Sequence, residues 1–312
     1  MSKIITVTAN TAVDWLIEAN GLGYQDNLQA TKSCEYACGK GINVAKAVES
    51  LGYPVTCLGF AGRQSIGLFE ALNSALLHAD LIAVEGKTRT NITLTDQAAG
   101  RETHIRTSGY RVTPDDCAKL IEKVERSVNA GDIVIFSGSL PPGAPNDFYR
   151  MLIATCRRKA AITLLDSSGQ GLAEGAKAEP YLIKPNMQEL EELTGRALTN
   201  DREVLETARA LLGQGIAKIC ISLGNKGVIA VDEDSAFAAC LRHCPEPIMT
   251  QIGCGDALVA GLAIGTHRGL RWEDCIKWAI ACATANLYSP EPGRLDKDKV
   301  PEISTQIETF PR

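Results

Sequence analysis

The chain has 312 residues, a hydrophobic content of 45% and a formal net charge of −5. This length and composition allow a large buried core, either in one α/β domain or in a domain with a small appendage. The acidic balance offers no basic patch, so nucleic-acid partners are not expected. No apolar run approaches the roughly 18 residues of a membrane span, and a polar start leads into a strand pattern at residues 4–9. We therefore expect a cytoplasmic protein without a membrane partner.

The eleven cysteines are odd in number, and most lie in apolar segments. Free thiols in a reducing compartment fit this usage better than disulfides. Cys34 and Cys38 have a spacing that a metal could use, as do Cys240 and Cys244 with His243 between them. A closed zinc site needs four ligands, and no second pair stands at zinc-finger spacing. A zinc site is therefore not expected.

Apolar, β-rich runs alternate with helical patterns along the chain. The pattern predicts strands at residues 4–9, 55–60, 132–137, 162–166, 181–184, 217–223 and 227–232. Helices are expected to begin near Gly41, Ile66, Thr113, Asn146, Asn186, Asp201, Gly255 and Trp272. Such alternation favours a mostly parallel sheet covered by helices on both faces, in which ligands bind beyond the carboxyl ends of the strands.

Three segments break this alternation. Residues 34–37, 88–95 and 102–107 read as short alternating strands with polar groups on one face. They predict a small β-lid formed by segments near 11–37 and 87–108, although ordinary edge hairpins would give the same pattern. No repeat or long linker is present, so we expect a single domain over residues 1–312 that includes this lid.

The sequence Gly253-Cys254-Gly255-Asp256 precedes a long apolar run with a helical pattern. Two glycines at a helix start can leave backbone N–H groups unpaired at the positive end of the helix dipole, which is an arrangement that binds anions. A carboxylate in the first turn could then take a proton from an alcohol that attacks a bound phosphate. The motif predicts a small-molecule kinase, although Asp is also a common first-turn residue.

Neither common nucleotide-binding fingerprint is present, because the chain contains no Gly-x-Gly-x-x-Gly after a strand and no Gly-x4-Gly-Lys-Ser/Thr. Polar, glycine-punctuated junctions stand instead at predicted strand ends or helix starts. They occupy residues 10–14, 39–43, 137–143, 184–189 and 222–227. Strand-end polar clusters are where α/β enzymes build their sites.

Together with residues 253–256, these junctions resemble the PfkB (ribokinase-like) carbohydrate kinases, within the branch of 1-phosphofructokinase and tagatose-6-phosphate kinase. The resemblance runs from Asn10 to about Leu295. Its specific motifs are residues 39–45 leading to Leu51-Gly52, and Gly253-x-Gly255-Asp256. It implies a three-layer α/β/α core with a β-sheet lid, ATP and Mg²⁺ as cosubstrates, and phosphoryl transfer to a sugar hydroxyl.

The resemblance also implies roles around the transferred phosphate. The N–H groups of Gly253, Cys254 and Gly255 would stabilise the phosphoryl oxygens, and Asp256 would deprotonate the acceptor. Asn186 and Glu189 would organise Mg²⁺ through water from one face of a helix; a plain capping pair is the alternative. By resemblance only, the residues expected along the nucleotide are Lys184, Ser222, Gly224 and Gly227, with Asn286 near the adenine.

At the acceptor end, the resemblance makes Asp14 the acceptor of hydrogen bonds from sugar hydroxyls. The other expected substrate-binding residues are Gly39, Lys40, Gly41, Asn43, Arg89 and Ser139. Lys40 and Arg89 are the expected partners of the phosphate already on the substrate, because Arg binds phosphate in a bidentate fashion and Lys supplies a mobile charge. Either could be a plain surface charge, and Arg106 is a weaker candidate.

This chain departs from the family pattern in three places. Cys38 and Cys254 replace residues that are usually Gly and Ala or Ser, and residues 106–110 replace a usual Asn-x-Pro-Gly-Pro. The acceptor expected is fructose 1-phosphate, which would give fructose 1,6-bisphosphate, with tagatose 6-phosphate or another hexose phosphate as the alternative. A sugar-phosphate sensor without catalysis is a distant alternative. Exposed lid edges predict a homodimer formed through the lid.

Overall fold

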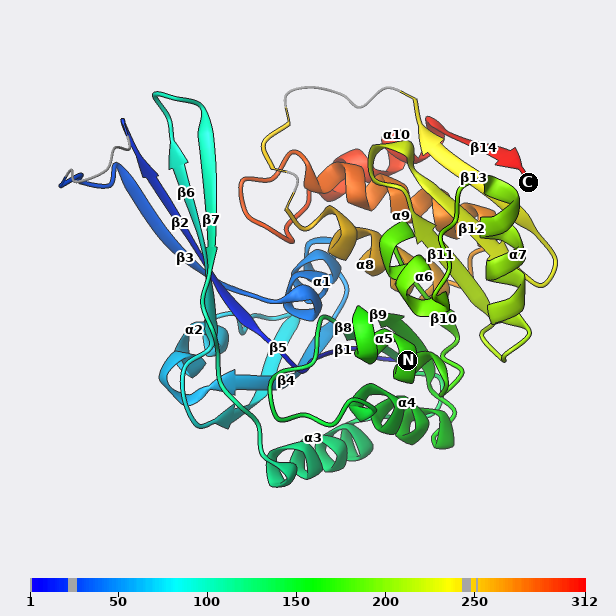
Figure 1. The fold of residues 1–312 in the computed structure, drawn as a ribbon, viewed down its shortest axis with the longest axis horizontal. Helices are drawn as coiled ribbons and strands as arrows, with labels where there is room; N and C mark the ends of the chain where they lie inside the picture. The colour runs from blue at the N-terminus through cyan, green and yellow to red at the C-terminus, as the bar shows by residue number, and fades with distance from the viewer. Residues whose placement is uncertain (1, 22–26, 243–247, 251) are drawn as a thin grey trace.

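The computed structural model describes residues 2–21, 27–242, 248–250 and 252–312. Within these residues, a large sheet and a small sheet carry the strands (Figure 1). In spatial order, the large sheet contains β14 (Ile307–Pro311), β13 (Ala236–Leu241), β12 (Val228–Asp232), β11 (Lys218–Ser222), β10 (Leu182–Ile183), β9 (Ile162–Asp166), β8 (Ile133–Ser137), β1 (Ile4–Thr8), β4 (Val55–Gly62) and β5 (Leu77–Val84). The strands from β11 to β5 are parallel, and those from β11 to β14 are antiparallel. The predicted fold class is confirmed.

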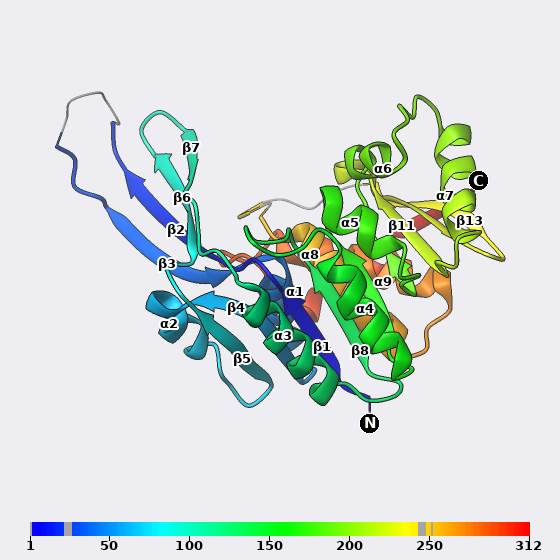
Figure 2. The same cartoon turned by 60° about the horizontal axis from the view of Figure 1, so that its bottom comes forward.

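Helices cover both faces of the large sheet (Figure 2). They are α1 (Lys40–Ser50), α2 (Ile66–Glu70), α3 (Pro114–Ser127), α4 (Phe148–Arg158), α5 (Gly169–Ala176), α6 (Met187–Thr194), α7 (Asp201–Leu212), α8 (Cys254–His267), α9 (Trp272–Asn286) and α10 (Val300–Thr305), with 3-10 turns η1 (Arg63–Ser65), η2 (Gly224–Lys226) and η3 (Lys297–Lys299). The core on one face includes α1, α8 and α9, and the core on the other includes α3, α4 and α7. Every residue of β1 is buried, as expected for a parallel strand between two helical layers.

The small sheet stands at one end of the molecule (Figure 1). Its order is β3 (Lys32–Cys38), β2 (Ala12–Ala19), β6 (Arg89–Asp96) and β7 (Arg101–Arg106). The central pair, β2 and β6, is parallel, and both outer pairs are antiparallel. This register places Asp14 between Tyr36 and Asn91. The predicted segment 11–37 includes residues 22–26, which lie outside the described residues.

Side-chain caps set several helix starts where the sequence indicated them. Thr113 accepts from the Asp116 N–H and Asp116 accepts from the Thr113 N–H, so α3 begins with a reciprocal cap. α4 begins at Phe148, two residues beyond the predicted Asn146. Among the described residues, no helix has both the length and the apolar content that crossing a bilayer would need.

Candidate active site

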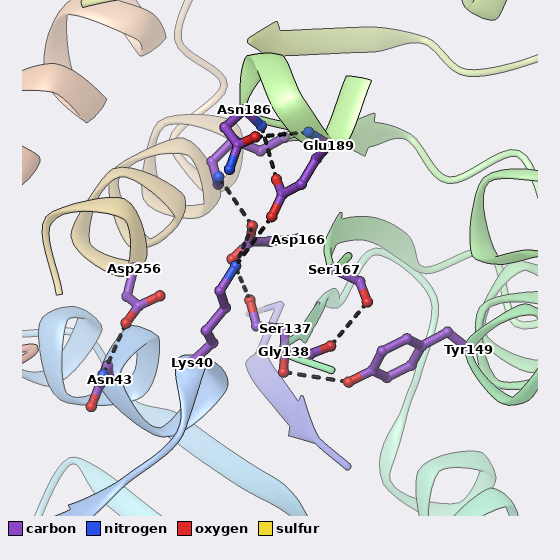
Figure 3. A network of polar contacts seen from close by, with 11 residues as sticks. Lys40, Asn43, Ser137, Gly138, Tyr149, Asp166, Ser167, Asn186, Glu189 and Asp256 are labelled. Carbon is purple, nitrogen blue, oxygen red and sulfur yellow. Dashed lines mark hydrogen bonds and ion pairs between the residues drawn. The ribbon is translucent and has the colours of Figure 1, made fainter. Parts of the chain in front are cut away.

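The candidate site lies where strand ends of the large sheet meet the starts of α1, α6 and α8 (Figure 3). Asp166 is the last residue of β9, and Lys184 follows β10. Lys40 begins α1, and Asp256 is in the first turn of α8. The carboxyl ends of parallel strands share one edge of a sheet, so residues distant in sequence converge there.

The start of α8 is open for an anion. Gly253 has φ +91° and is followed by the first helical hydrogen bond, from Ala257 N–H to the Gly253 carbonyl at 2.8 Å, and no side chain caps the helix. A Cβ at Gly253 would lie 2.7 Å from Gly293 N, whereas a Cβ at Gly255 would meet nothing within 4 Å. Gly253 is therefore required by the turn, and Gly255 borders open space beside N–H groups that helix geometry leaves without backbone partners.

Asp256 has the environment of a general base. Its side chain is buried, and Asn43 Nδ2 donates a hydrogen bond to Asp256 Oδ2 at 2.9 Å. Burial and the negative charge of Asp166 raise the pKa of Asp256 to about 7, against the opposing effects of the Asn43 hydrogen bond, Lys40 and Lys184. A carboxylate poised near neutral pH is suited to accept a proton from an alcohol.

Asp166 is the functional candidate that the sequence patterns missed. Its carboxylate is fully buried between Lys184 Nζ at 3.0 Å and Lys40 Nζ at 3.4 Å. Burial opposes ionisation, but the two lysines overcome it and hold the pKa of Asp166 below its usual value. The Ser137 hydroxyl donates to Asp166 Oδ2 at 3.3 Å. The sequence did offer one signal for Asp166, because a carboxylate at the end of a predicted parallel strand is a candidate site residue.

Lys40 reaches across the site toward the same carboxylate (Figure 3). Besides Asp166, its Nζ lies 3.9 Å from Glu189 Oε1, and Asp166 is the main cause of the raised pKa of Lys40. The ammonium therefore faces the side on which Lys184 and α6 lie. Its predicted contact with the phosphate already on the acceptor stays a prediction.

Asn186 and Glu189 cap α6 reciprocally. Asn186 Oδ1 accepts from the Glu189 N–H at 2.8 Å, and Glu189 Oε2 accepts from the Asn186 N–H at 2.9 Å. The capping alternative is thus present in the structure, and it leaves Glu189 Oε1 directed toward Lys40. Within the described residues, no three acidic, His or Cys side chains form a metal-binding group. The side-chain oxygens of Asn186 and Glu189 fit a water-mediated contact with a hard cation better than direct coordination by several protein ligands.

Two of the residues expected along the nucleotide, Lys184 and Ser222, lie beside the start of α6. Asn186 forms an isolated parallel bridge with Ser222, whose N–H donates to the Pro185 carbonyl at 2.9 Å. Gly224, at φ +64°, has open space where a Cβ would point. Gly227 differs, because a Cβ there would lie 2.0 Å from the Ala239 carbonyl oxygen. Packing and a backbone φ of +87° therefore both require glycine at position 227.

Asn286 lies beneath the α8 turn. Its side chain is fully buried, and Nδ2 donates to the Ile252 carbonyl at 2.9 Å and contacts Cys254 Sγ at 3.5 Å. In this structure Asn286 supports the turn from behind. Its predicted position near the adenine stays a prediction.

The loop around Gly293 joins the two helix starts. A Cβ at Gly293 would lie 2.8 Å from Asn43 Cα, so the loop packs directly between Asn43 and Gly253. Lys46 Nζ, which is buried, lies 3.0 Å from Glu291 Oε1. Arg294 pairs with Glu49 on α1. These ion pairs hold the loop, and with it the relative positions of α1 and α8.

The glycines at the start of α1 allow close packing on β1. Gly39 has φ +124°, and a Cβ at Gly41 would lie 2.3 Å from Thr8 Oγ1. The Asn43 N–H donates to the Gly39 carbonyl at 2.9 Å. Both glycines thus have a packing role that places Asn43 opposite Asp256.

The acceptor-end residues lie on and beside the small sheet. Asp14 Oδ1 accepts from Asn91 Nδ2 at 2.8 Å. Arg89 is half-buried, and it donates to the carbonyl oxygens of Thr11 and Asn10 at 3.2 and 3.3 Å. Asn10 Nδ2 also donates to Ser139 Oγ at 3.0 Å. The junction at residues 10–11 therefore connects Arg89 with Ser139.

The departure at residues 106–110 has a structural explanation. Tyr110 is buried, and its hydroxyl accepts from the Thr11 N–H at 3.0 Å and lies 3.0 Å from the Ala9 carbonyl oxygen. A Cβ at Gly109 would lie 2.8 Å from Arg89 N. Tyr110 thus fixes the backbone that holds Arg89. Arg106 is exposed, and the register of β6 and β7 places it opposite Asn91.

The described cysteines form no disulfide with one another, and Cys38 is buried beside Asp14. Burial raises the pKa of the Cys38 thiol, so it stays protonated. Cys254 is partly exposed at the α8 turn. His243 and Cys244 lie outside the described residues.

Comparisons with known proteins agree with this geometry. The model of the pfkB family carbohydrate kinases matches residues 4–297. A 1-phosphofructokinase of Escherichia coli (strain K12) is 33% identical over 99% of this chain and 98% of that protein, and one of Bacillus subtilis (strain 168) is 29% identical over 93% and 94%. A crystal structure of phosphofructokinase-2 from Escherichia coli in complex with fructose-6-phosphate is similar with a TM-score of 0.86 at 25% identity, covering 98% of this chain and 99% of that one.

The family match spans nearly the whole chain, and it includes the α1 start, the strand ends and the α8 turn. The resemblance identified from the sequence motifs is thereby confirmed. The chain belongs to the pfkB family of carbohydrate kinases, and it is a phosphotransferase.

Proposed function

We propose that this protein transfers the γ-phosphoryl group of ATP to the C6 hydroxyl of fructose 1-phosphate. The products are fructose 1,6-bisphosphate, ADP and a proton. The observation that carries the proposal is a buried Asp256, with its pKa raised to about 7, in the first turn of a helix whose start is open to an anion. The choice of acceptor follows the curated relatives named 1-phosphofructokinase.

In this mechanism Asp256 orients the C6 hydroxyl and takes its proton as the oxygen attacks the γ-phosphorus. Asn43 holds the carboxylate in place. The N–H groups of Gly253, Cys254 and Gly255 face the charge that accumulates on the equatorial phosphoryl oxygens. Each such fixed donor contributes on the order of 10²-fold or more to the rate, and a positioned base roughly 10²–10⁴-fold.

On the nucleotide side, Lys184, Ser222, Gly224 and Gly227 line the path of ATP. Lys40, at the start of α1, faces these residues. Its ammonium would leave Asp166 and balance the negative charge of a bound phosphate instead. Asn186 and Glu189 would hold Mg²⁺ through water molecules, since their oxygens also cap α6. When bound, Mg²⁺ neutralises charge on the nucleotide phosphates.

On the acceptor side, Asp14 accepts hydrogen bonds from sugar hydroxyls, and Arg89 binds the resident phosphate. The walls of the acceptor site are completed by Gly39, Gly41, Asn43 and Ser139. Burial is the main reason that the pKa of Arg89 is lowered. A phosphate dianion would relieve this cost of burial by pairing with the guanidinium.

The test combines an acceptor panel with one variant. The panel of fructose 1-phosphate, fructose 6-phosphate, tagatose 6-phosphate and free fructose is scored by ADP release with MgATP. We expect the highest kcat/KM with fructose 1-phosphate. Asp256→Asn should lower kcat by at least about 10²-fold while leaving ATP and sugar-phosphate binding nearly intact. Preference for another acceptor would overturn the substrate, and unchanged turnover in Asp256→Asn would overturn the mechanism.

We also propose that two copies associate through the small sheet, which would then act as a lid over each acceptor site. Its outer strands β3 and β7 each have one unpaired edge, and every residue of β7 is exposed. The exposed Ile105 adds apolar surface to that strand. Unpaired edges of this kind are readily covered by a second copy.

A further inference from the structure

Two asparagine–carboxylate pairs in this protein have the same construction. Asn43 Nδ2 donates to Asp256 Oδ2 at 2.9 Å, and Asn91 Nδ2 donates to Asp14 Oδ1 at 2.8 Å. In both pairs the amide oxygen is buried and has no hydrogen-bond partner among the described residues. One pair serves the proposed base, and the other serves the proposed sugar-binding carboxylate.

The orientation of the Asn91 amide follows from its neighbour. An ionised carboxylate only accepts hydrogen bonds, so the NH₂ group must face Asp14 and the amide oxygen must point elsewhere. A buried acceptor without a partner is unfavourable for folding. The Asn91 side chain therefore does more than stabilise the fold. Its one hydrogen bond within the described part of the chain is the one that it donates to Asp14.

The small sheet fixes this contact through its register. Asp14 on β2 and Asn91 on β6 are direct neighbours in a parallel pair. On the other side of Asp14 stand Tyr36, its antiparallel neighbour on β3, and the buried Cys38 thiol. Asn91 is thus the amide donor that Asp14 receives from β6.

We propose that Asn91 is a positioning residue for the acceptor sugar, which it serves by holding the Asp14 carboxylate in the orientation that receives sugar hydroxyls. The proposal rests on the proposed role of Asp14 in the kinase reaction. Loss of Asn91 should weaken acceptor binding and leave the nucleotide site unchanged, because that site lies on other elements of the fold.

The first test compares Asn91→Ala and Asn91→Leu with Thr93→Val. Thr93 is on the same face of β6, but its hydroxyl contacts His104 instead of Asp14. We expect the two Asn91 variants to raise the acceptor KM by about tenfold or more, with the KM for MgATP within about twofold of the wild type. Asn91→Leu should also keep its melting temperature within about 2 °C, because it removes an unpaired polar atom.

The second test uses Asn91→Asp, which is nearly isosteric. Two carboxylates this close resist ionising together, so at low pH they share one proton, which takes the place of the amide N–H. The acceptor KM should then be near the wild-type value at pH 5.5 and rise at least about fivefold relative to wild type by pH 8.5, as the shared proton leaves.

The other charged or titratable groups around Asp14 do not produce this profile. Tyr36 and Cys38 come from β3, Arg89 from β6 and Arg106 from β7, and Lys46 and Asp256 face the Cys38 thiol. Burial raises the pKa of both Tyr36 and Cys38. Titration of Asp256 affects the wild type and the variant alike, so it cancels when the acceptor KM of the variant is divided by that of the wild type at each pH.

The outcomes separate the two proposals. If the wild type phosphorylates the acceptor and the Asn91 variants keep an acceptor KM within twofold of it, Asn91 has no positioning role. A lowered melting temperature with an unchanged pH dependence of KM would make Asn91 merely structural and would also overturn the inference. A wild type that phosphorylates no ketose phosphate would overturn the proposed function, independently of any Asn91 variant.

Discussion

The hydrogen bond from Asn43 to Asp256 should set the pH at which the base becomes active, and Asn43→Leu removes it. The donor lies 2.9 Å from Asp256 Oδ2 in a buried site. A hydrogen bond to a charged group contributes roughly 1.5–3 kcal/mol, or about 1–2 pKa units at about 1.36 kcal/mol per unit. Because the bond favours the ionised carboxylate, its loss should raise the pKa of Asp256 from about 7 to roughly 8–9.

The base acts as the carboxylate, so this shift lowers activity at neutral pH. The ionised fraction at pH 7 would fall from about one half to between about a tenth and a hundredth, which lowers kcat/KM by roughly 5–50-fold. The loss should be recovered as the pH rises above the new pKa. The assay is kcat/KM for fructose 1-phosphate between pH 5.5 and 9.5, at one saturating MgATP concentration for variant and wild type.

Asn43 is also a proposed contact of the sugar, and the profile separates the two effects. A lost sugar contact lowers the plateau at high pH, whereas the lost hydrogen bond moves the acid limb. Ser50→Ala is the control on the same helix, since that hydroxyl donates to the Lys46 carbonyl and its loss should leave the acid limb in place. An unshifted acid limb in Asn43→Leu, whatever its plateau, would refute the reasoning.

Two further predictions concern the α8 turn and the assembly. Gly253→Ala should lower the free energy of unfolding by about 1–3 kcal/mol or more in a urea titration, because φ is +91° there and the methyl group would meet Gly293. Gly255→Ala should keep its stability and instead lower kcat, since its methyl group enters open space beside the proposed phosphoryl site; the opposite pattern would contradict our account of the turn. Sedimentation equilibrium should give a dimer that Ile105→Lys on β7 weakens by at least about tenfold in Kd, while a wild-type monomer at micromolar concentration would exclude the proposed pairing.

The regular parts of the fold were predictable because their local signals agree with the packing. β9 has the predicted bounds, residues 162–166, and α6 and α7 start at or beside the predicted Asn186 and Asp201. β5, β13 and β14 were not predicted. They lie toward the two ends of the large sheet, where solvent exposure breaks the continuous apolar pattern of the central strands.

α5 was missed for a different reason. Its sequence contains Gly169, Gly171 and Gly175, and glycine is a poor helix former. A Cβ at Gly171 would lie 2.7 Å from Ser167 Oγ, and one at Gly175 would lie 2.8 Å from Leu165 Cδ2. Close packing on β9 therefore outweighs the low propensity, and packing of that kind cannot be read from a local pattern.

The candidate site was partly predictable because its glycines, Asp256 and the Asn186–Glu189 pair stand in short motifs. Asp166, Asn91 and Tyr110 carry no such motif. Their importance depends on partners far along the chain, such as Lys40 for Asp166 and Thr11 for Tyr110. Those relations become visible only when strand register and loop packing bring the partners together.

The placement of Asp14, Arg89 and Asn91 on a separate sheet bears on how this enzyme could evolve. The proposed phosphoryl-transfer residues belong to the large sheet and its helices, which the Gly293 loop locks together. Substitutions confined to β2, β6 and β7 could therefore alter which sugar is accepted without disturbing the chemistry. These three strands hold 22 residues, so a duplicated gene could change its acceptor by exploring a small part of its sequence while the rest remained under unchanged selection.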